Sequence, residues 1–233
     1  MEIPGYGLQA GRWDLKGKFL DYIGHLDCKG KRVLDVGCAS GFLSFSSEEY
    51  GAEDVVSFDM DSAKRQHLLP FHDKPYYLDY DTWVQTQNAF IEQWKNAYWL
   101  AHRAFRSTAK VYYGDIYALP EQLGGFDIVI LGAILEHLSD PIRALTSVSR
   151  IASSMIVINT EVLETEDRIA RFDGDASRPD FDYVFWTYSV GTYRHVLRML
   201  GFEIIRITKQ DYRHTLLEGL YPRTAIVARR IHG

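Results

Sequence analysis

A turn of five small residues is the part of the sequence whose residue types point most directly to chemistry. It reads Gly37-Cys38-Ala39-Ser40-Gly41 and joins an apolar run at 32–36 to a helical pattern at 42–50. Its two glycines let the backbone turn tightly and come close to a ligand. The first turn of the helix that follows presents free N–H groups to an electronegative group. The pattern therefore predicts a ligand site at this strand-to-helix connection.

Carboxylates stand beside this turn and at the ends of the next two expected strands. Asp35 lies two residues before the turn, Asp59 ends a strand expected at 55–58, and Asp115 follows a strand expected at 110–113. Ligands of an open parallel sheet bind beyond the carboxyl ends of its strands, and an acid after the second strand accepts hydrogen bonds from ribose hydroxyls. These positions predict a site for a cofactor that contains a nucleoside.

The spacing around the turn separates two classes of nucleoside cofactor. Dinucleotide sites use Gly-x-Gly-x-x-Gly, whereas here Ala39 and Phe42 stand where the second and third glycines would be. Asp35 would repel a pyrophosphate, but it suits a ligand that carries an ammonium or sulfonium group. S-Adenosylmethionine is therefore the favoured cofactor, with a nicotinamide dinucleotide as the alternative.

The elements that position these residues alternate between β-branched runs and helical patterns, which indicates an α/β fold with a mostly parallel sheet. Strands are expected at 32–36, 55–58, 110–113, 126–133, 155–159, 202–207 and 224–228. Asp140 and Ser189 are expected to cap two further helices. No Pro/Gly/Ser-rich linker interrupts the chain, so we expect one domain over 1–233. Within it we expect a substrate-side segment at 1–30, an aromatic-rich insert or lid at 62–108 and an acceptor-side loop at 160–189.

The run from Val33 to Gly41 resembles the first motif of class I S-adenosylmethionine-dependent methyltransferases, whose fold is a Rossmann-like, seven-stranded, mostly parallel sheet. The resemblance implies that Asp59 binds the ribose, that Met60 packs on the adenine and that Asp115 reaches the adenine amino group. The segment Leu131 to His137 resembles the family's fourth motif, which lines the methionine part of the cofactor. The cofactor-binding residues implied are Asp35, Gly37, Cys38, Ala39, Gly41, Asp59, Met60, Asp115, Ile116 and Leu131.

Two further stretches resemble a branch of this family related to the tRNA wobble-uridine carboxymethyltransferases, which use carboxy-S-adenosylmethionine. They are Trp13-Asp14, ahead of the first strand, and Tyr98 to Arg103. Two features depart from that branch: Ala39 replaces its usual glycine, and the residues before 30 are too few for its helical tRNA-binding extension. The net charge of -5, from 26 Lys and Arg against 31 Asp and Glu, argues against a nucleic-acid partner. We therefore carry over the fold and not the tRNA substrate.

Fewer residues of the sequence point to a site for the methyl acceptor. His137 is the candidate general base because an imidazole titrates near neutral pH, and Glu136 beside it is the other candidate catalytic residue. The alternative, given equal weight, is that these two residues only cap the next segment or pair with each other. Aromatic residues of the insert serve either a core or a lid, and Cys38 is expected to pack beside the cofactor rather than act as a nucleophile. The candidate substrate-binding residues are Trp13, Tyr98, His102 and Trp186.

These observations predict a methyltransferase that acts on a small molecule, most favourably at an oxygen. The alternatives are an RNA methyl- or carboxymethyltransferase and a catalytically silent module that binds S-adenosylmethionine. Two cysteines without zinc-site spacing predict no metal. The absence of a long apolar run or a secretory signal predicts a cytoplasmic protein that does not enter a membrane. The sequence also allows a homodimer.

Overall fold

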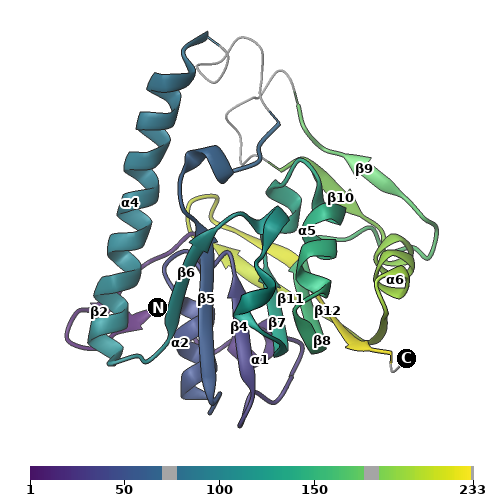
Figure 1. Cartoon of the computed structure of the whole chain (residues 1–233), viewed down its shortest axis with the longest axis horizontal. Coiled ribbons are helices and arrows are strands. Elements are labelled where there is room, and N and C mark those ends of the chain that lie inside the picture. The colour runs from purple at the N-terminus through teal and green to yellow at the C-terminus, as the bar shows by residue number, and fades with distance from the viewer. Residues whose placement is uncertain (70–77, 176–183, 232–233) are drawn as a thin grey trace.

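The computed structural model describes residues 1–69, 78–175 and 184–231, and its centre is an eight-stranded sheet (Figure 1). The strands lie in the order β3-β11-β12-β8-β7-β4-β5-β6. In chain order they are β3 (Trp13–Asp14), β4 (Arg32–Val36), β5 (Asp54–Met60), β6 (Lys110–Gly114), β7 (Phe126–Gly132), β8 (Ala152–Thr160), β11 (Phe202–His214) and β12 (Gly219–Arg230). β4 to β8 pair in parallel, whereas β12, β11 and β3 are added antiparallel. The predicted α/β fold class is thus confirmed.

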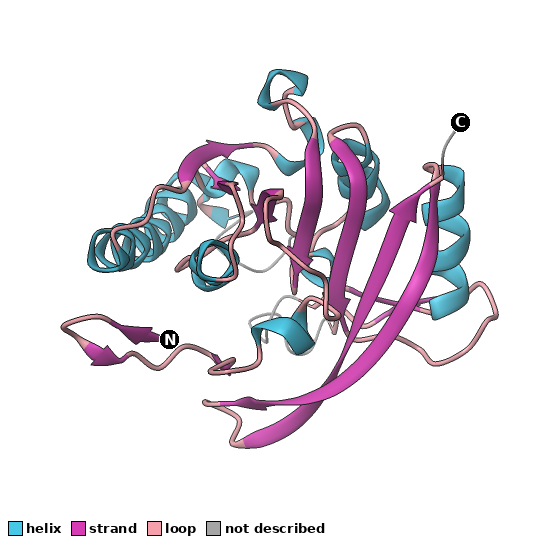
Figure 2. Ribbon diagram, turned by 90° about the horizontal axis from the view of Figure 1, so that it is seen from below, coloured by secondary structure: helices cyan, strands magenta, loops and turns pink. Residues whose placement is uncertain are grey.

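Helices lie on both faces of this sheet (Figure 2). The α-helices are α1 (Phe19–Tyr22), α2 (Phe42–Glu49), α4 (Tyr80–Phe105), α5 (Pro141–Ser149) and α6 (Val190–Met199). Single 3-10 turns are η1 (Ala63–Arg65), η2 (Ile116–Ala118), η3 (Glu121–Leu123) and η4 (Leu135–His137). Two small ribbons complete the fold: β1 (Glu2–Ile3) with β2 (Gly7–Leu8), and β9 (Ala170–Phe172) with β10 (Trp186–Tyr188).

The central strands are buried on both faces, and alternate residues face different helices. Leu34 and Val36 of β4 join a core formed with α5 and α6. Val33 joins a second core formed with α1 and α2. Asp35 alternates onto the same face as Val33, and it is fully buried there. The turn after β4 therefore starts from a rigid, doubly covered strand.

The sheet differs from the prediction at its antiparallel edge. β11 and β12 continue well beyond the expected 202–207 and 224–228, and β3 adds an eighth strand beside β11. Most of the extension of β11 is exposed and polar, including Lys209, Gln210 and Asp211. The run at 208–211 is entirely polar and shows no apolar alternation, so the sequence pattern did not signal this extension.

The insert after β5 is dominated by one 26-residue helix, α4. The Asp79 side chain caps it by accepting a hydrogen bond from the Thr82 N–H. Its buried residues include Val84, Ile91 and Tyr98, at a spacing of seven that forms one stripe. Part of the expected insert, 70–77, and part of the expected acceptor-side loop, 176–183, lie outside the described residues. None of the helices in the described ranges is long and apolar enough to cross a membrane.

Candidate active site

The glycine turn has little room for side chains. Gly41 has φ +84°, and a Cβ there would lie 2.5 Å from Phe45 and 2.8 Å from Tyr98. Gly37 has φ +80°, and a Cβ there would lie 3.2 Å from Ile134. Positive φ strains any residue with a Cβ, so both the backbone and the packing require glycine at 41. The turn then leads into α2, with Gly41 as its N-cap.

A small hollow lies where this turn meets β5, β6 and α4. Its lining residues are Ala39, Asp59, Met60, Ile91, Trp94, Lys95 and Tyr113. The Asp59 carboxylate accepts 2.8 Å hydrogen bonds from the N–H groups of Ala39 and Met60. Burial raises the pKa of Asp59 above its ordinary value, and these two N–H groups oppose that effect. The second strand's acid is thus clamped to the turn at the edge of the hollow.

Asp35 stands under the turn, with its side chain in the interior. Its Oδ2 accepts a 2.7 Å hydrogen bond from the Ser44 hydroxyl of α2. Its Oδ1 is buried and has no hydrogen-bond partner within the described structure. Burial raises the pKa of Asp35 to about 7, and the Ser44 hydroxyl opposes that effect. A buried carboxylate oxygen without a partner is costly, so a hydrogen-bond donor placed beside it would be stabilising.

Asp115, after β6, is already engaged by the protein. Its carboxylate lies 3.0 Å from the Arg65 guanidinium and 2.6 Å from Nε2 of His67, and it accepts the Tyr117 N–H at 2.9 Å. Burial opposes its charge, but the Tyr117 N–H, His67 and Arg65 outweigh this and lower the pKa of Asp115. The His67 ring stacks on Tyr117 at 4.0 Å between centroids. A ligand amino group would have to share Asp115 with these partners.

A second polar group lies beyond the end of β7, centred on a buried ion pair. Glu136 is 5% exposed, and its Oε1 lies 2.5 Å from Nη2 of Arg223 in β12. Its Oε2 accepts the Thr160 hydroxyl at 2.8 Å. Burial opposes the charge of Glu136, but Arg223 outweighs this and lowers the pKa of Glu136. With both oxygens occupied, Glu136 is a structural partner of Arg223 rather than a proton acceptor.

Trp13 and Tyr22 lie beside this ion pair, and Trp186 contacts the segment that follows η4. The Arg223 guanidinium lies 5.6 Å from the centroid of the Trp13 ring. Tyr22 lies next to Gly132 at the end of β7, because a Cβ at Gly132 would be 3.3 Å from the Tyr22 hydroxyl. Burial raises the pKa of Tyr22, while Arg223 lowers it and Glu136 raises it. The Trp186 indole N–H donates to the Ser139 carbonyl at 3.2 Å. The candidate acceptor residues Trp13 and Trp186 therefore lie near the segment that carries His137, which is half-buried in η4.

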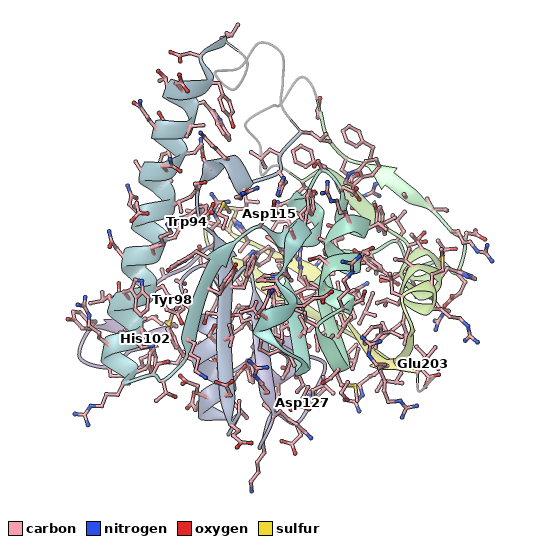
Figure 3. The ribbon with its side chains drawn as sticks, viewed as in Figure 1. Trp94, Tyr98, His102, Asp115, Asp127 and Glu203 are labelled. Carbon is pink, nitrogen blue, oxygen red and sulfur yellow. The ribbon has the colours of Figure 1, made fainter. Side chains whose placement is uncertain are left out.

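Two predicted substrate contacts do not fit the structure, and Figure 3 shows why. Tyr98 is 1% exposed, and its hydroxyl lies 2.7 Å from the Ser57 hydroxyl in the interior. His102 lies toward the opposite end of the sheet from Asp115, and its Nε2 is 3.0 Å from the carbonyl oxygen of Ala109, just before β6. A helix rises about 1.5 Å per residue, so a residue eight positions beyond Trp94 on α4 is far from the hollow.

Three predicted cofactor residues contribute no exposed side chain. Ile116 and Leu131 are buried in the core under α5 and α6, so only their backbones can meet a ligand. Cys38 packs with Phe45 and Tyr98, and burial raises the pKa of its thiol well above the ordinary value. The side chain of Cys38 therefore packs in the interior.

Sequence reasoning missed residues both at the hollow beside Asp59 and at the ion pair between Glu136 and Arg223. Trp94 stands at the level of Asp115 and borders the hollow (Figure 3). Its sequence signal was the aromatic density of the insert, which does not distinguish core from site. Arg223 had no signal, because a single arginine in an expected strand carries no spacing pattern. In the described ranges, no group of three or more His, Cys, Asp and Glu side chains could hold a metal ion.

Comparison with known proteins decides the family. The family described as methyltransferase domain matches residues 11–207, which is more than half of the chain. The chain belongs to this family. The predicted membership of the class I S-adenosylmethionine-dependent methyltransferases, with S-adenosylmethionine as the cofactor, is thereby confirmed.

Relatives of this chain include proteins of the predicted branch. A tRNA U34 carboxymethyltransferase from Ectopseudomonas mendocina is 27% identical over 204 residues, covering 83% of this chain and 52% of that protein. A ubiquinone biosynthesis O-methyltransferase from Neisseria meningitidis is 48% identical over 71 residues, covering 25% of this chain and 30% of that protein. The chain thus spans about half the length of the first relative and less of the second.

A solved structure supports the fold. Magnesium protoporphyrin IX methyltransferase from Synechocystis, with bound S-adenosylhomocysteine, superposes with a TM-score of 0.57 at 16% identity, covering 93% of this chain and 81% of that chain. At this identity the likeness concerns the fold alone.

The residues of this methyltransferase fit its cofactor. The cofactor carries an ammonium, a sulfonium, a ribose and an adenine. The unpartnered Asp35 Oδ1 suits the ammonium electrostatically, and a side chain at Gly41 would clash with Phe45 and Tyr98 and disturb the turn. Asp59 and Trp94 border one hollow and offer an acceptor for ribose hydroxyls and a flat apolar face for a ring. The donor set therefore agrees with the family.

Proposed function

We propose that the chain transfers a methyl group from S-adenosylmethionine to an oxygen of a small molecule. The observation that carries the proposal is the hollow at the carboxyl ends of β5 and β6, where Asp59 and Trp94 meet the turn that requires glycine at 41. In this proposal Asp59 holds the ribose, Trp94 and Met60 hold the adenine, and Asp35 holds the ammonium. The bound cofactor supplies an electrophilic methyl group on sulfonium.

The acceptor would lie on the other side of the glycine turn, near Tyr22, Trp13 and Trp186. Direct displacement requires alignment of the acceptor atom with the methyl group, and flat rigid side chains provide such alignment. His137 remains the proposed base for a hydroxyl acceptor, because Glu136 is held by Arg223. The name of the Neisseria meningitidis relative, an O-methyltransferase, supports transfer to oxygen.

The charge state of the acceptor side favours methyl transfer over carboxymethyl transfer. A carboxymethyl group brings a carboxylate to the reaction site, and a buried carboxylate needs a cation that is not already neutralised. Arg223 is such a buried cation on this side, but Glu136 forms a 2.5 Å ion pair with it. The pair is neutral as a whole, so it offers little net attraction to a further anion.

A calorimetric comparison of S-adenosylmethionine with carboxy-S-adenosylmethionine tests this choice. We expect the wild-type protein to bind S-adenosylmethionine about 10-fold or more tightly, because an imperfectly paired buried charge costs roughly 1–3 kcal/mol. Glu136→Gln leaves Arg223 unneutralised, so this ratio should move toward the carboxylated cofactor. Thermal melts should accompany the variant, since breaking one partner of a buried ion pair costs about 3–5 kcal/mol. Tighter binding of the carboxylated cofactor to the wild type would contradict methyl transfer.

A second measurement separates small-molecule from RNA acceptors. We expect bulk tRNA to bind weakly to this acidic protein, since neutralised phosphates supply most of the affinity in nucleic-acid complexes. Tight binding of bulk tRNA that weakens steeply with salt would overturn the small-molecule proposal and leave the cofactor assignment intact.

A further inference from the structure

We propose that Tyr98 of the insert helix α4 is a positioning residue for the cofactor: a buried relay of hydroxyl groups connects it to Asp35 and favours the charged form of that carboxylate. The inference rests on the proposed role of Asp35 toward the cofactor ammonium. It gives the insert a function in cofactor binding even though Tyr98 itself touches no ligand.

The relay is a continuous line of short hydrogen bonds. The Tyr98 hydroxyl lies 2.7 Å from the Ser57 hydroxyl of β5. The Ser57 hydroxyl lies 2.7 Å from the Ser44 hydroxyl of α2, which lies 2.7 Å from Asp35 Oδ2. Three of these side chains have no exposed surface and Tyr98 is 1% exposed. Water therefore does not replace a missing member easily, and the four groups act as one unit.

Counting hydrogens gives the relay a direction. Ser44 has one hydroxyl hydrogen and donates it to Asp35, so Ser57 must donate to Ser44. The single hydrogen of Ser57 is then used, and Tyr98 must donate to Ser57. Every donor thus points toward the carboxylate. Each bond polarises the next, which strengthens the last one and favours ionised Asp35.

The surroundings of Asp35 make this support necessary. The titratable groups near it are Asp59 at the end of β5, Cys38 in the turn, Tyr22 of α1 and Tyr98 itself. All four are acids, so none attracts the charge of Asp35. Burial raises the pKa of Asp35 to about 7, and the hydrogen bonds from Ser44 lower it. The relay therefore acts together with the Ser44 N–H to lower the pKa of Asp35 and favour its charged form.

Tyr98→Phe tests the relay with little change in packing. Phenylalanine keeps the ring contact with Phe45, at 5.1 Å between centroids, and removes only the hydroxyl. The readout is the affinity for S-adenosylhomocysteine, which retains the ammonium, measured by calorimetry from about pH 5.5 to about pH 8.5. Protonation of Asp35 weakens binding of a cation, so affinity falls at low pH in both proteins. In the variant the midpoint of this fall should move upward by about half to one pH unit, since one hydrogen bond is worth about 1 kcal/mol.

A matched serine pair controls for structural damage. Ser47 is as buried as Ser44 on the same helix, but it donates to the Leu43 carbonyl outside the relay. Ser44→Ala should shift the midpoint as Tyr98→Phe does, or more, whereas Ser47→Ala should not shift it. In a Ser57→Ala background, which cuts the relay in the middle, Tyr98→Phe should add no further shift.

The outcomes separate this inference from the proposed function. An unchanged midpoint in folded Tyr98→Phe, or full additivity with Ser57→Ala, would overturn the relay while wild-type binding still supports the cofactor site. A uniform loss of affinity at every pH would also overturn it, because a structural defect gives no pH shift. Failure of the wild type to bind S-adenosylhomocysteine would instead remove the proposed function.

Discussion

A single buried carboxylate, Asp35, shows how the requirements of the site and of stability oppose each other. Its burial raises its pKa to about 7, whereas the ordinary value in an unfolded chain is near 3.9. The folded state therefore binds the proton more tightly than the unfolded state. Stability conferred at this position is largest at low pH, falls as pH rises from about 4 to about 7, and is lost above that range.

Replacement of this carboxylate should stabilise the protein and impair its site. Asp35→Asn keeps the shape and an acceptor for the Ser44 hydroxyl, and it removes the buried charge. We expect it to raise the unfolding free energy by about 1–3 kcal/mol near pH 8, with the gain vanishing toward about pH 4. Urea unfolding at several pH values measures this. A variant that is less stable at pH 8 would contradict the burial account.

The same variant should bind S-adenosylhomocysteine about 10-fold or more weakly at pH 8, because one hydrogen bond to a charged group contributes about 1.5–3 kcal/mol. Asp127→Asn is the matched control. Asp127 accepts the Arg32 N–H at 2.9 Å at the other end of the sheet (Figure 3). An equal loss of affinity in both variants would argue against a specific role for Asp35.

Among the secondary-structure elements, the helix α4 contributes the most site residues that the sequence did not predict. It brings Ile91, Trp94 and Lys95 to the hollow at one level and Tyr98 to the interior one turn further on. The aromatic residues of the insert thus divide between the interior and the edge of the hollow. Whether an aromatic residue of α4 is buried or lines the hollow depends on which side of the helix packs against the sheet, and no local sequence pattern predicts that side.

Two aromatic residues of α4 allow a paired test of the hollow. Trp94 is 42% exposed and borders the hollow, whereas Phe90 is 49% exposed one turn earlier and does not line it. We expect Trp94→Ala to weaken S-adenosylhomocysteine binding about 10-fold, since an aromatic pair contributes about 0.5–1.5 kcal/mol beyond area burial. Phe90→Ala should leave the affinity unchanged. Equal effects of the two changes on calorimetric affinity would contradict the placement of the adenine.

Other elements were predictable because their signals are local. The strands at 32–36, 55–58 and 126–133 are short apolar runs between turns, and the structure contains them within two residues at each end. The capping side chains of Asp140 and Ser189 accept the N–H groups of Arg143 and Thr192, as expected from their residue types. Contacts between distant elements, such as Glu136 with Arg223, leave no such trace.

For the whole molecule, the sheet order divides the site into two sides. β5 and β6 lie on one side of β4 and carry Asp59 and the hollow, whereas β7, β8 and β12 lie on the other side and carry Glu136 and Arg223. A cofactor that crosses the end of β4 would reach from one to the other. The glycine turn and its neighbouring acids could be predicted from the sequence because ligands of an open α/β sheet bind where the strand order reverses, at the ends of these strands. The charge balance of the acceptor side emerges only when β12 folds back beside β8.

The most direct test of the central claim is a calorimetric titration with S-adenosylhomocysteine of the wild-type protein and of Asp59→Ala, with NADH titrated in parallel. We expect micromolar binding to the wild type, about 10- to 100-fold weaker binding to the variant through lost hydrogen bonds to ribose, and no heat from NADH. Binding of NADH alone, or an affinity for S-adenosylhomocysteine that Asp59→Ala leaves unchanged, would contradict the cofactor site described for this chain.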